Sequence, residues 1–295
     1  MTFFLECRVQ APEALSSWIA NTIEQLRKHP RLVVALSGGV DSAVLLALAV
    51  EALGSSRVVG VTGRSDAVTD DEMSDARGVA DRLGVRHEIV MTRELDNPDY
   101  VANRGDRCYH CRKELFTLLA AIAKDRFPAR VAYGAIVDDL GEHRPGMDAA
   151  RELGILSPLL DAGLTKADVR QFASAAGLAV AAKPANACLA SRIPTGIPVR
   201  REALAQIAAA ERRLRTLGFP IVRVRHHGVR ARIEVPREDL SRLRDAERSG
   251  LVLAAVAASG FATHEIDPEG YRPGGAGRTD PETLYSIAPQ RDGGQ

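Results

Sequence analysis

The 295-residue sequence lacks three features that would place it in a specialised class of protein. It has almost no net charge, +1 from 39 basic and 38 acidic residues, which argues against a broad electrostatic grip on a long nucleic acid. No apolar run approaches the roughly 18 residues that a membrane helix needs. The N-terminus has no basic region and an early acid, Glu6, unlike a signal peptide. We therefore expect a globular protein with no stable nucleic-acid partner and no membrane association.

Cysteine is also scarce, with four residues in the chain, Cys7, Cys108, Cys111 and Cys188. In a chain without an export signal this number indicates a cytoplasmic protein, in which thiols serve metals or catalysis more often than disulfides. The sequence assigns no role to Cys7.

A glycine-rich turn lies between an apolar run at 32–36 and a helix-favouring run at 43–48, an order that indicates strand, phosphate loop and helix. Glycines let the backbone approach an oxyanion, and hydroxyls and N–H groups at the helix start can donate to phosphate. The lysine of a Walker loop is absent, so the turn resembles the PP-loop of ATP pyrophosphatases. The residues expected to bind ATP are Ser37, Gly38, Gly39, Asp41 and Ser42, with Mg²⁺ held by Asp41.

Strand-like and helix-like runs alternate with short joins as far as Gly134. This predicts an α/β fold with a doubly wound parallel sheet, whose ligand site lies beyond the carboxyl ends of the strands. Thr62 lies at that edge and suits the adenine and ribose side of ATP, or is an ordinary strand exit. Asp138 and Asp139 follow the fourth strand, where they complete the Mg²⁺ site, touch the ribose or cap a turn.

Thr165 and Asp168 form a capping box that predicts the start of a helix, and this helix carries two basic residues, Lys166 and Arg170. Lys166 and Arg170 either face phosphates or lie on a solvated helix face.

Cys108 and Cys111 form a Cys-x-x-Cys pair at the start of another helix-like run. Both sulfurs can face one point, and basic neighbours at a helix N-terminus favour the thiolate. A zinc site wants a second such pair, which the sequence does not contain. Together with Cys188 the pair can hold an iron–sulfur cluster with one open iron. The other reading is two buried or merely redox-active thiols.

The loop 183–196 has no regular apolar period, and its prolines enclose Cys188 and Arg192. Loops of this kind usually position functional groups on a scaffold. We expect Arg192 to favour the thiolate of Cys188 and to orient an anionic substrate. Cys188 is equally explained as a small buried residue.

The chain is expected to divide into a first domain at 1–195, a smaller α/β domain at 196–271 and a disordered tail at 272–295. Runs at 221–225 and 231–235 alternate in polarity around a turn, which predicts a β-hairpin. Arg223 and Arg225 share one face of it, where they either hold a phosphate or form a salt-bridged solvent face. His226 and His227 have no clear partner.

The PP-loop, the cysteine pair and several later motifs together resemble the LarE family of PP-loop sulfur transferases. The later motifs are His-Arg-Pro-Gly at 143–146, Ser-Pro-Leu at 157–159, Gly-Leu-Thr-Lys at 163–166 and the loop 183–194. The resemblance implies adenylation of a carboxylate of pyridinium-3,5-biscarboxylic acid mononucleotide, followed by replacement of the acyl-AMP with a thioacid. The product serves the nickel-pincer cofactor of lactate racemase.

The resemblance also implies roles for single residues. Cys188 matches the sulfur donor, which either gives up its own sulfur or works through a [4Fe–4S] cluster on Cys108, Cys111 and Cys188. Arg223 and Arg225 match an Arg-x-Arg that holds the substrate phosphate, to which we add Arg192. Glu211 either matches an acidic metal-site residue or lies on a solvent-exposed helix face. We expect a homo-oligomer acting on a small nucleotide with ATP and Mg²⁺.

Two other readings stay open. One is another PP-loop enzyme, either a tRNA thiolase, against which the near-neutral charge weighs, or an ammonia-dependent amidating synthetase, which needs none of the three cysteines. The other is a protein that binds an adenine nucleotide without turnover.

Overall fold

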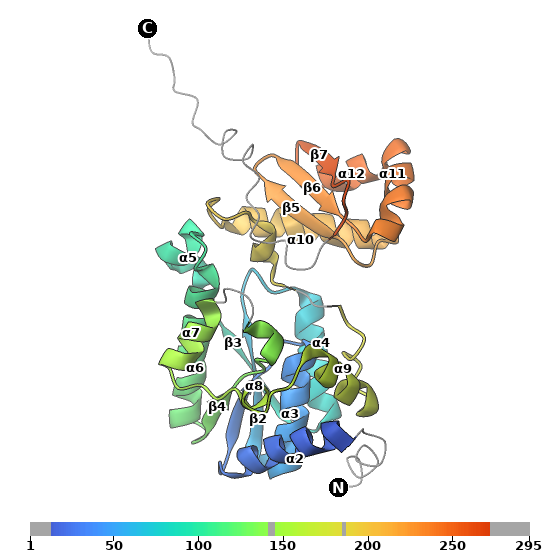
Figure 1. Cartoon of the computed structure of the whole chain (residues 1–295). Helices are drawn as coiled ribbons and strands as arrows, with labels where there is room; N and C mark the ends of the chain where they lie inside the picture. Colours follow the sequence, from blue (N-terminus) through green and yellow to red (C-terminus); the bar gives the residue numbers. More distant parts are fainter. Residues whose placement is uncertain (1–12, 141–144, 185–186, 272–295) are drawn as a thin grey trace. The chain divides into compact units, whose positions relative to one another are not determined.

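The computed structural model describes residues 13–140, 145–184 and 187–271 (Figure 1). The chain forms two compact units, the first made of residues up to 97 with 106–186, and the second of 98–105 with the residues from 187. The predictions for Cys7, His143 and the tail at 272–295 lie outside the described residues. The division at residue 195 stays a prediction. Within the described ranges, no helix is long and apolar enough to cross a membrane.

A four-stranded parallel sheet in the order β3-β2-β1-β4 forms the centre of the first unit. Its strands are β1 (Leu32–Ala35), β2 (Val58–Arg64), β3 (Arg86–Met91) and β4 (Arg130–Ala132). This confirms the predicted α/β fold with a parallel sheet. The carboxyl ends of its strands meet at one edge, where ligands bind in folds of this kind.

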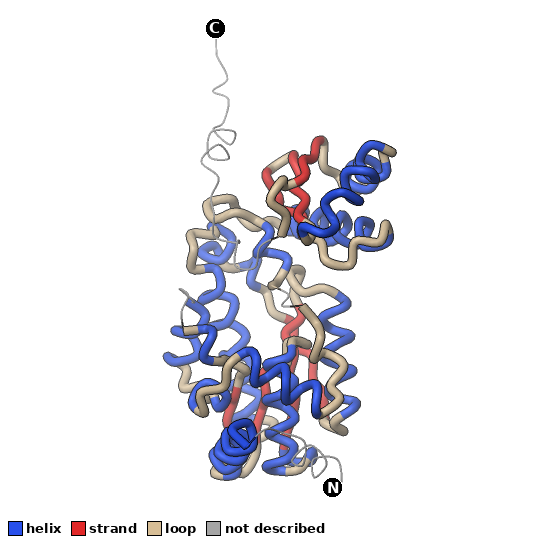
Figure 2. The backbone as a smooth tube through the Cα atoms, turned by 45° about the vertical axis from the view of Figure 1, so that its right-hand side comes forward, coloured by secondary structure: helices blue, strands red, loops and turns tan. Residues whose placement is uncertain are grey.

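Helices cover both faces of this sheet (Figures 1 and 2). They are α2 (Glu13–Arg27), α3 (Val40–Leu53), α4 (Asp70–Arg82), α6 (Arg107–Asp125), α7 (Pro145–Glu152), α8 (Pro158–Asp161) and α9 (Lys166–Ala175). In β1, Leu32 and Val34 join the core that α2, α3, α4 and α9 cover, whereas Val33 joins the core under α6 and α7. Because the strand is buried on both faces, its sequence is an unbroken apolar run.

The second unit contains a three-stranded sheet in the order β5-β6-β7. Its elements are α5 (Pro98–Ala102), α10 (Arg201–Thr216), β5 (Arg223–His227), β6 (Arg230–Glu234), α11 (Leu240–Arg248), α12 (Leu251–Ala257) and β7 (Thr263–Ile266). The antiparallel pairing of β5 with β6 confirms the predicted hairpin, and Val224 lies opposite Ile233 in its buried interior.

Asn103 ties the short segment 98–105 into the second unit. Its side-chain amide donates to the carbonyl oxygens of Pro194 at 2.8 Å and Ile197 at 2.9 Å, and its own carbonyl accepts from the N–H of Gly196 at 2.9 Å. The residue has a positive φ of 50°, a conformation that asparagine tolerates better than most residues. The segment therefore fixes the loop that follows Arg192.

Candidate functional site

The PP-loop joins the end of β1 to the start of α3. Gly38 has a φ of +75°, and a Cβ there would lie 2.5 Å from the carbonyl oxygen of Glu72, so a side chain does not fit. The hydroxyl of Ser42 accepts from the N–H of Ser37 at 3.1 Å and donates to the carbonyl of Gly39 at 3.0 Å. These bonds fix the turn and present its backbone at the N-terminus of α3, where anions are stabilised.

Gly134, just after β4, allows this helix start to lie close to the strand. A Cβ on Gly134 would lie 2.8 Å from the carbonyl carbon of Asp41 and from the backbone nitrogen of Ser42. The strand exit and the PP-loop are thus packed backbone against backbone at the edge that the sequence predicts as the ligand site.

Asp41 forms an ion pair with Lys166, the first residue of α9. The ammonium lies 2.9 and 2.8 Å from the two carboxylate oxygens, and about a quarter of each side chain is exposed, 26% for Asp41 and 29% for Lys166. Burial raises the pKa of the Asp41 carboxyl above its ordinary value, and the hydrogen bond from Lys166 opposes this shift. The sequence singled out both residues but did not predict that they meet.

Asp138 and Asp139 lie beside this pair and are held by backbone groups. Asp138 accepts the N–H of Lys166 at 2.8 Å, and Asp139 accepts the N–H of Ile136 at 3.0 Å. Asp139 is near enough to Asp41 to add to the rise in the pKa of Asp41. Carboxylate oxygens suit Mg²⁺. No three His, Cys, Asp or Glu side chains come together as a metal site among the described residues, so a metal here would need water or phosphate oxygens as further ligands.

Arg170 is held by two hydrogen bonds within the first unit and is near enough to Asp41 for its charge to lower the pKa of that carboxyl. Its guanidinium donates to the carbonyl oxygens of Ala181 at 3.1 Å and Lys183 at 3.0 Å. It therefore holds the start of the cysteine-containing loop within the first unit.

Thr62 is buried at the end of β2. Its hydroxyl donates to the carbonyl of Leu36 at 2.6 Å and lies 2.7 Å from Nε2 of His87. A hydroxyl has one proton, so Nε2–H of His87 is the donor in the second bond. Burial, with the charge of Arg77, lowers the pKa of His87. Because both hydrogen bonds of the hydroxyl are made within the protein, only the backbone of Thr62 can make the predicted contact with ATP.

Cys108 and Cys111 lie in the first turn of α6, three residues apart and on the same face. Cys108 is exposed, and the thiol of Cys111 is 3.4 Å from Oε1 of Glu94. Two thiols in this arrangement suit a soft metal or an iron–sulfur cluster as part of its ligand set. Nothing in the sequence indicates the contact with Glu94.

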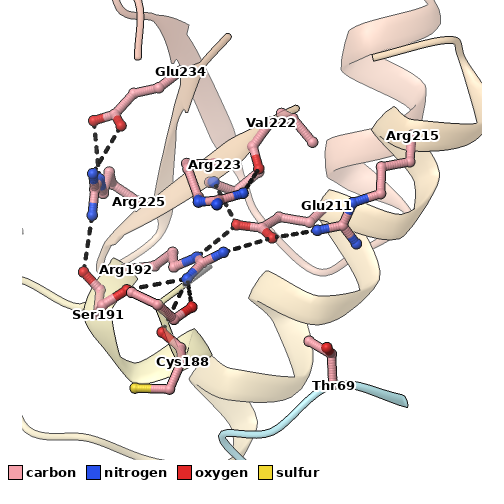
Figure 3. Close-up of polar contacts among 12 residues, drawn as sticks. Thr69, Cys188, Ser191, Arg192, Glu211, Arg215, Val222, Arg223, Arg225 and Glu234 are labelled. Carbon is pink, nitrogen blue, oxygen red and sulfur yellow. Dashed lines mark hydrogen bonds and ion pairs between the residues drawn. The ribbon is translucent and has the colours of Figure 1, made fainter. Parts of the chain in front are cut away.

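Cys188 precedes the short 3₁₀ turn Leu189–Arg192 in the second unit and is partly exposed. The guanidinium of Arg192 donates to the carbonyl oxygens of Ala187 and Cys188, the latter at 3.0 Å, and to the hydroxyl of Ser191 at 3.1 Å. Figure 3 shows the carbonyl of Cys188 turned toward Arg192 and its sulfur turned away. Arg192 thus holds the backbone of the cysteine, and the sulfur lies on the side away from the guanidinium.

Glu211 on α10 is the acceptor that holds Arg192. Its carboxylate, fully buried, accepts from Arg192 at 2.8 and 3.2 Å, from Arg215 at 2.9 Å and from the N–H of Val224 at 3.1 Å (Figure 3). Arg192 is only 1% exposed, and all three of its side-chain nitrogens donate within the protein. The pair is a fixed part of the Cys188 loop.

Arg223 and Arg225 do not form the solvent face that was one of the two readings. Arg223 is 7% exposed, donates to the carbonyl of Val222 and lies with its guanidinium carbon 5.2 Å from the centre of the Tyr271 ring. Burial, followed by repulsion from Arg192, lowers the pKa of Arg223. Arg225 makes a bidentate pair with Glu234, both bonds at 2.9 Å, and donates to the carbonyl of Ser191.

Comparison with known proteins places these features in a family. The NAD synthase family model matches residues 12–130. The pyridinium-3,5-bisthiocarboxylic acid mononucleotide synthase of Lactiplantibacillus plantarum is 37% identical over 217 residues, 74% of this chain and 79% of that protein. The chain belongs to the LarE family. An uncharacterized protein of Synechocystis is also 37% identical, over 88% of this chain and 97% of its own length. A solved NMN synthetase from Francisella tularensis superposes with a TM-score of 0.48 at 17% identity, covering 58% of this chain and 75% of that one.

Membership of the LarE family confirms the predicted class, an ATP-dependent sulfur transferase built on a PP-loop. The roles of individual residues stay predictions. Sequence reasoning missed Asn103, whose only signal is an asparagine in a polar loop two residues before Gly105. For Glu211 it left a metal site or an exposed helix face open, and the structure shows the residue buried against Arg192.

Proposed function

We propose that this LarE-family enzyme uses ATP to adenylate a carboxylate of pyridinium-3,5-biscarboxylic acid mononucleotide and then converts it to a thiocarboxylate. One observation carries the proposal. A chain 37% identical to a synthase of the bisthiocarboxylic acid mononucleotide has both a preformed PP-loop and a cysteine loop whose backbone is held from inside the protein.

Adenylation takes place at the PP-loop. A carboxylate oxygen of the substrate attacks the α-phosphorus of ATP, a P–O bond forms, and pyrophosphate leaves with the electron pair of the bond that breaks. The N–H groups at the start of α3 donate to the leaving oxygens, where negative charge develops, and the hydroxyl of Ser37 joins them when it turns away from Ser42. Mg²⁺ held by Asp41, when bound, supplies further neutralisation of that charge.

Sulfur transfer follows at Cys188. Its thiolate attacks the acyl carbon, a C–S bond forms, and AMP leaves with the electrons of the C–O bond. In the sacrificial version, loss of the Cα proton of Cys188 then breaks its Cβ–S bond, which leaves dehydroalanine in the chain and sulfur on the product. In the catalytic version, Cys108, Cys111 and Cys188 would hold a [4Fe–4S] cluster, which would supply the sulfide in place of the Cys188 sulfur. The first two cysteines belong to the first unit and Cys188 to the second.

The arginines divide into two roles. Arg223 and Arg225, both on the β5 strand, hold the phosphate of the substrate nucleotide, the role that the resemblance assigns to them. All three side-chain nitrogens of Arg225 donate within the protein, to Glu234 and to the carbonyl of Ser191, so Arg225 has to contact the phosphate through a remaining N–H group or give up one of these bonds. Arg192 instead positions Cys188, because its guanidinium is buried and donates to the carbonyl of Cys188 and to Glu211. We therefore replace the phosphate contact predicted for Arg192 by a positioning role.

The test is the intact mass of anaerobically purified protein before and after turnover with ATP, Mg²⁺ and the biscarboxylate mononucleotide. A loss equal to H₂S, located at Cys188, supports the sacrificial version. An unchanged polypeptide with bound iron and several thiocarboxylates per chain supports the cluster version. No thiocarboxylate under either condition overturns the proposed substrate.

Two variants serve as controls. Cys188→Ala is expected to make no thiocarboxylate while still releasing pyrophosphate in the presence of the substrate, since adenylation does not need the thiol. The double variant Cys108→Ser and Cys111→Ser is expected to keep the sacrificial reaction and to lose the cluster-dependent one. Conversion of the carboxylate to an amide by Cys188→Ala in the presence of ammonia would instead favour an amidating enzyme.

A further inference from the structure

The pair between Asp41 and Lys166 places a lysine where the proposed metal ion would bind. Both oxygens of the Asp41 carboxylate lie within 2.9 Å of a single ammonium. A divalent cation needs the same oxygens. Lysine and metal therefore compete for one carboxylate.

The base of Lys166 is fixed, whereas its end is not enclosed. Its N–H donates to Asp138, and the preceding Thr165 forms a capping box with Asp168 that anchors the start of α9. The side chain is 29% exposed and has four rotatable carbon–carbon bonds beyond the backbone. The ammonium can leave Asp41 while α9 stays in place.

Lys166 is also the group that neutralises a local excess of acid. Asp41, Asp138 and Asp139 lie close together at the strand exits. Arg170, the next cation on α9, donates to two backbone carbonyls and acts on Asp41 through its charge alone, whereas Lys166 contacts both carboxylate oxygens. Without Lys166 this acidic group would attract any divalent cation from solution.

We propose that Lys166 is an exchangeable counter-ion that keeps free divalent cations off Asp41 and moves to the triphosphate when metal-bound ATP enters. The proposal rests on the proposed ATP site. A triphosphate brings oxygens for both the metal and the ammonium, so the carboxylate is never left with two cations or with none. The lysine then opposes binding of the metal alone and favours binding of the metal–nucleotide complex.

The experiment measures two affinities of the full-length protein with Lys166→Met, which removes the charge and keeps the length of the side chain. The first is for Mn²⁺ alone, followed by electron paramagnetic resonance. The second is for Mn²⁺ with α,β-methylene ATP, which cannot release pyrophosphate. We expect the first affinity to rise about tenfold and the second to fall about tenfold, since both changes come from one charge at a part-exposed site. Neither measurement uses sulfur transfer.

Three controls make the result specific. Lys166→Arg keeps the charge and should bind Mn²⁺ alone as weakly as the wild type. Lys113→Met removes a lysine paired with Glu152 on α7 and should change neither affinity. Adding Asp41→Asn to Lys166→Met should abolish the gain in Mn²⁺ binding.

The proposal is overturned if Lys166→Met leaves Mn²⁺ binding unchanged, or if both affinities fall together, which would make the lysine a mere support for Asp41. It is also overturned if the metal–nucleotide complex binds as well as before. A wild-type protein that binds no metal–nucleotide complex would instead contradict the proposed function, and the arm with Mn²⁺ alone would still test the competition at Asp41.

Discussion

Each unit of the molecule has an acid–base pair at its proposed site, and the two pairs are built differently. In the first unit Asp41 meets Lys166, with about a quarter of each side chain exposed. In the second unit Glu211 meets Arg192, with 1% of each exposed and with further donors from Arg215 and Val224. The lysine ammonium, on a flexible side chain, suits an ion pair that must exchange partners. The planar guanidinium of arginine, which donates several hydrogen bonds in a fixed geometry, suits an ion pair that stays in place.

The difference has an energetic side. Breaking a buried pair by removing one partner costs about 3–5 kcal/mol because a buried charge is left uncompensated. A part-exposed pair contributes about 1 kcal/mol or less. The four predictions below test this contrast and the packing around each pair.

The largest effect is expected for Glu211→Ala. The variant leaves Arg192 and Arg215 without their carboxylate, so the free energy of unfolding should fall by about 3–5 kcal/mol, measured by urea denaturation. Glu211→Gln, which keeps the shape and one acceptor oxygen, should lose less. A loss below about 1 kcal/mol for the alanine variant would show that the buried pair is no more important for stability than an exposed one.

Gly134→Ala tests whether close backbone packing fixes the PP-loop, as the hydrogen bonds of Arg192 fix the Cys188 loop. The new Cβ would meet the backbone of Asp41 and Ser42 at 2.8 Å, so we expect a loss of about 1–3 kcal/mol in stability together with weaker ATP binding. Gly78→Ala is the matched control, because Gly78 lies inside α4 with no atom within 4 Å of its added Cβ. That change should stabilise the protein by about 0.5–1 kcal/mol. Equal behaviour of the two variants would contradict the close packing.

Lys166→Met should change the free energy of unfolding by no more than about 1 kcal/mol. The reason is that solvent already screens the pair with Asp41, so its loss costs little in the folded protein. Thermal melts at low and high salt would measure this, with a smaller difference expected at high salt. A loss as large as that of Glu211→Ala would mean that the two pairs do not differ in kind.

The smallest effect is expected in the pH dependence of stability, to which the buried His226 of the second unit contributes. Nε2 of His226 pairs with Oε1 of Gln206 at 2.9 Å, while Nδ1 is buried and has no hydrogen-bond partner among the residues that the structure describes. Burial lowers the pKa of His226 below its ordinary 6.5. The unfolded chain therefore takes up a proton more readily, so this contribution to stability is complete above pH 6.5 and is lost as the pH falls toward the folded pKa.

Melting temperatures between pH 7.5 and 5.5 would reveal this dependence. His226→Gln should flatten it slightly, and the remaining slope should include His29 and His87, whose pKa values burial also lowers. An unchanged slope in the variant would exclude His226 as a contributor.

The sequence predicted the parts of the fold whose signals are local. The PP-loop, the parallel sheet and the β5–β6 hairpin follow from runs of apolar residues and from glycines over short spans. It predicted Asp41 as a site residue and left Lys166 between a phosphate contact and a solvated helix face. The pairing of the two depends on two helix starts that are 125 residues apart. No spacing rule covers such a distance.

Arg192 shows a second limit. An arginine next to a reactive cysteine has the same sequence signal whether it faces the substrate or the interior. The direction in which the Arg192 side chain points depends on Glu211, nineteen residues later on α10, and on the carbonyl groups of the loop that contains Arg192. Asn103 was missed for the same reason, since its partners lie near Pro194.

The hydrogen bonds of Asn103 have a consequence for the order in which the protein folds during synthesis. Asn103 is made 91 residues before Pro194, its partner, and closing so long a loop costs entropy that only later contacts repay. The second unit can form these bonds only after residue 197 has left the ribosome, when every residue of the first unit has already been made. The segment 98–105 lies between the two parts of the first unit in the sequence, so we expect it to stay unpaired while the first unit folds around it and to join its own unit last.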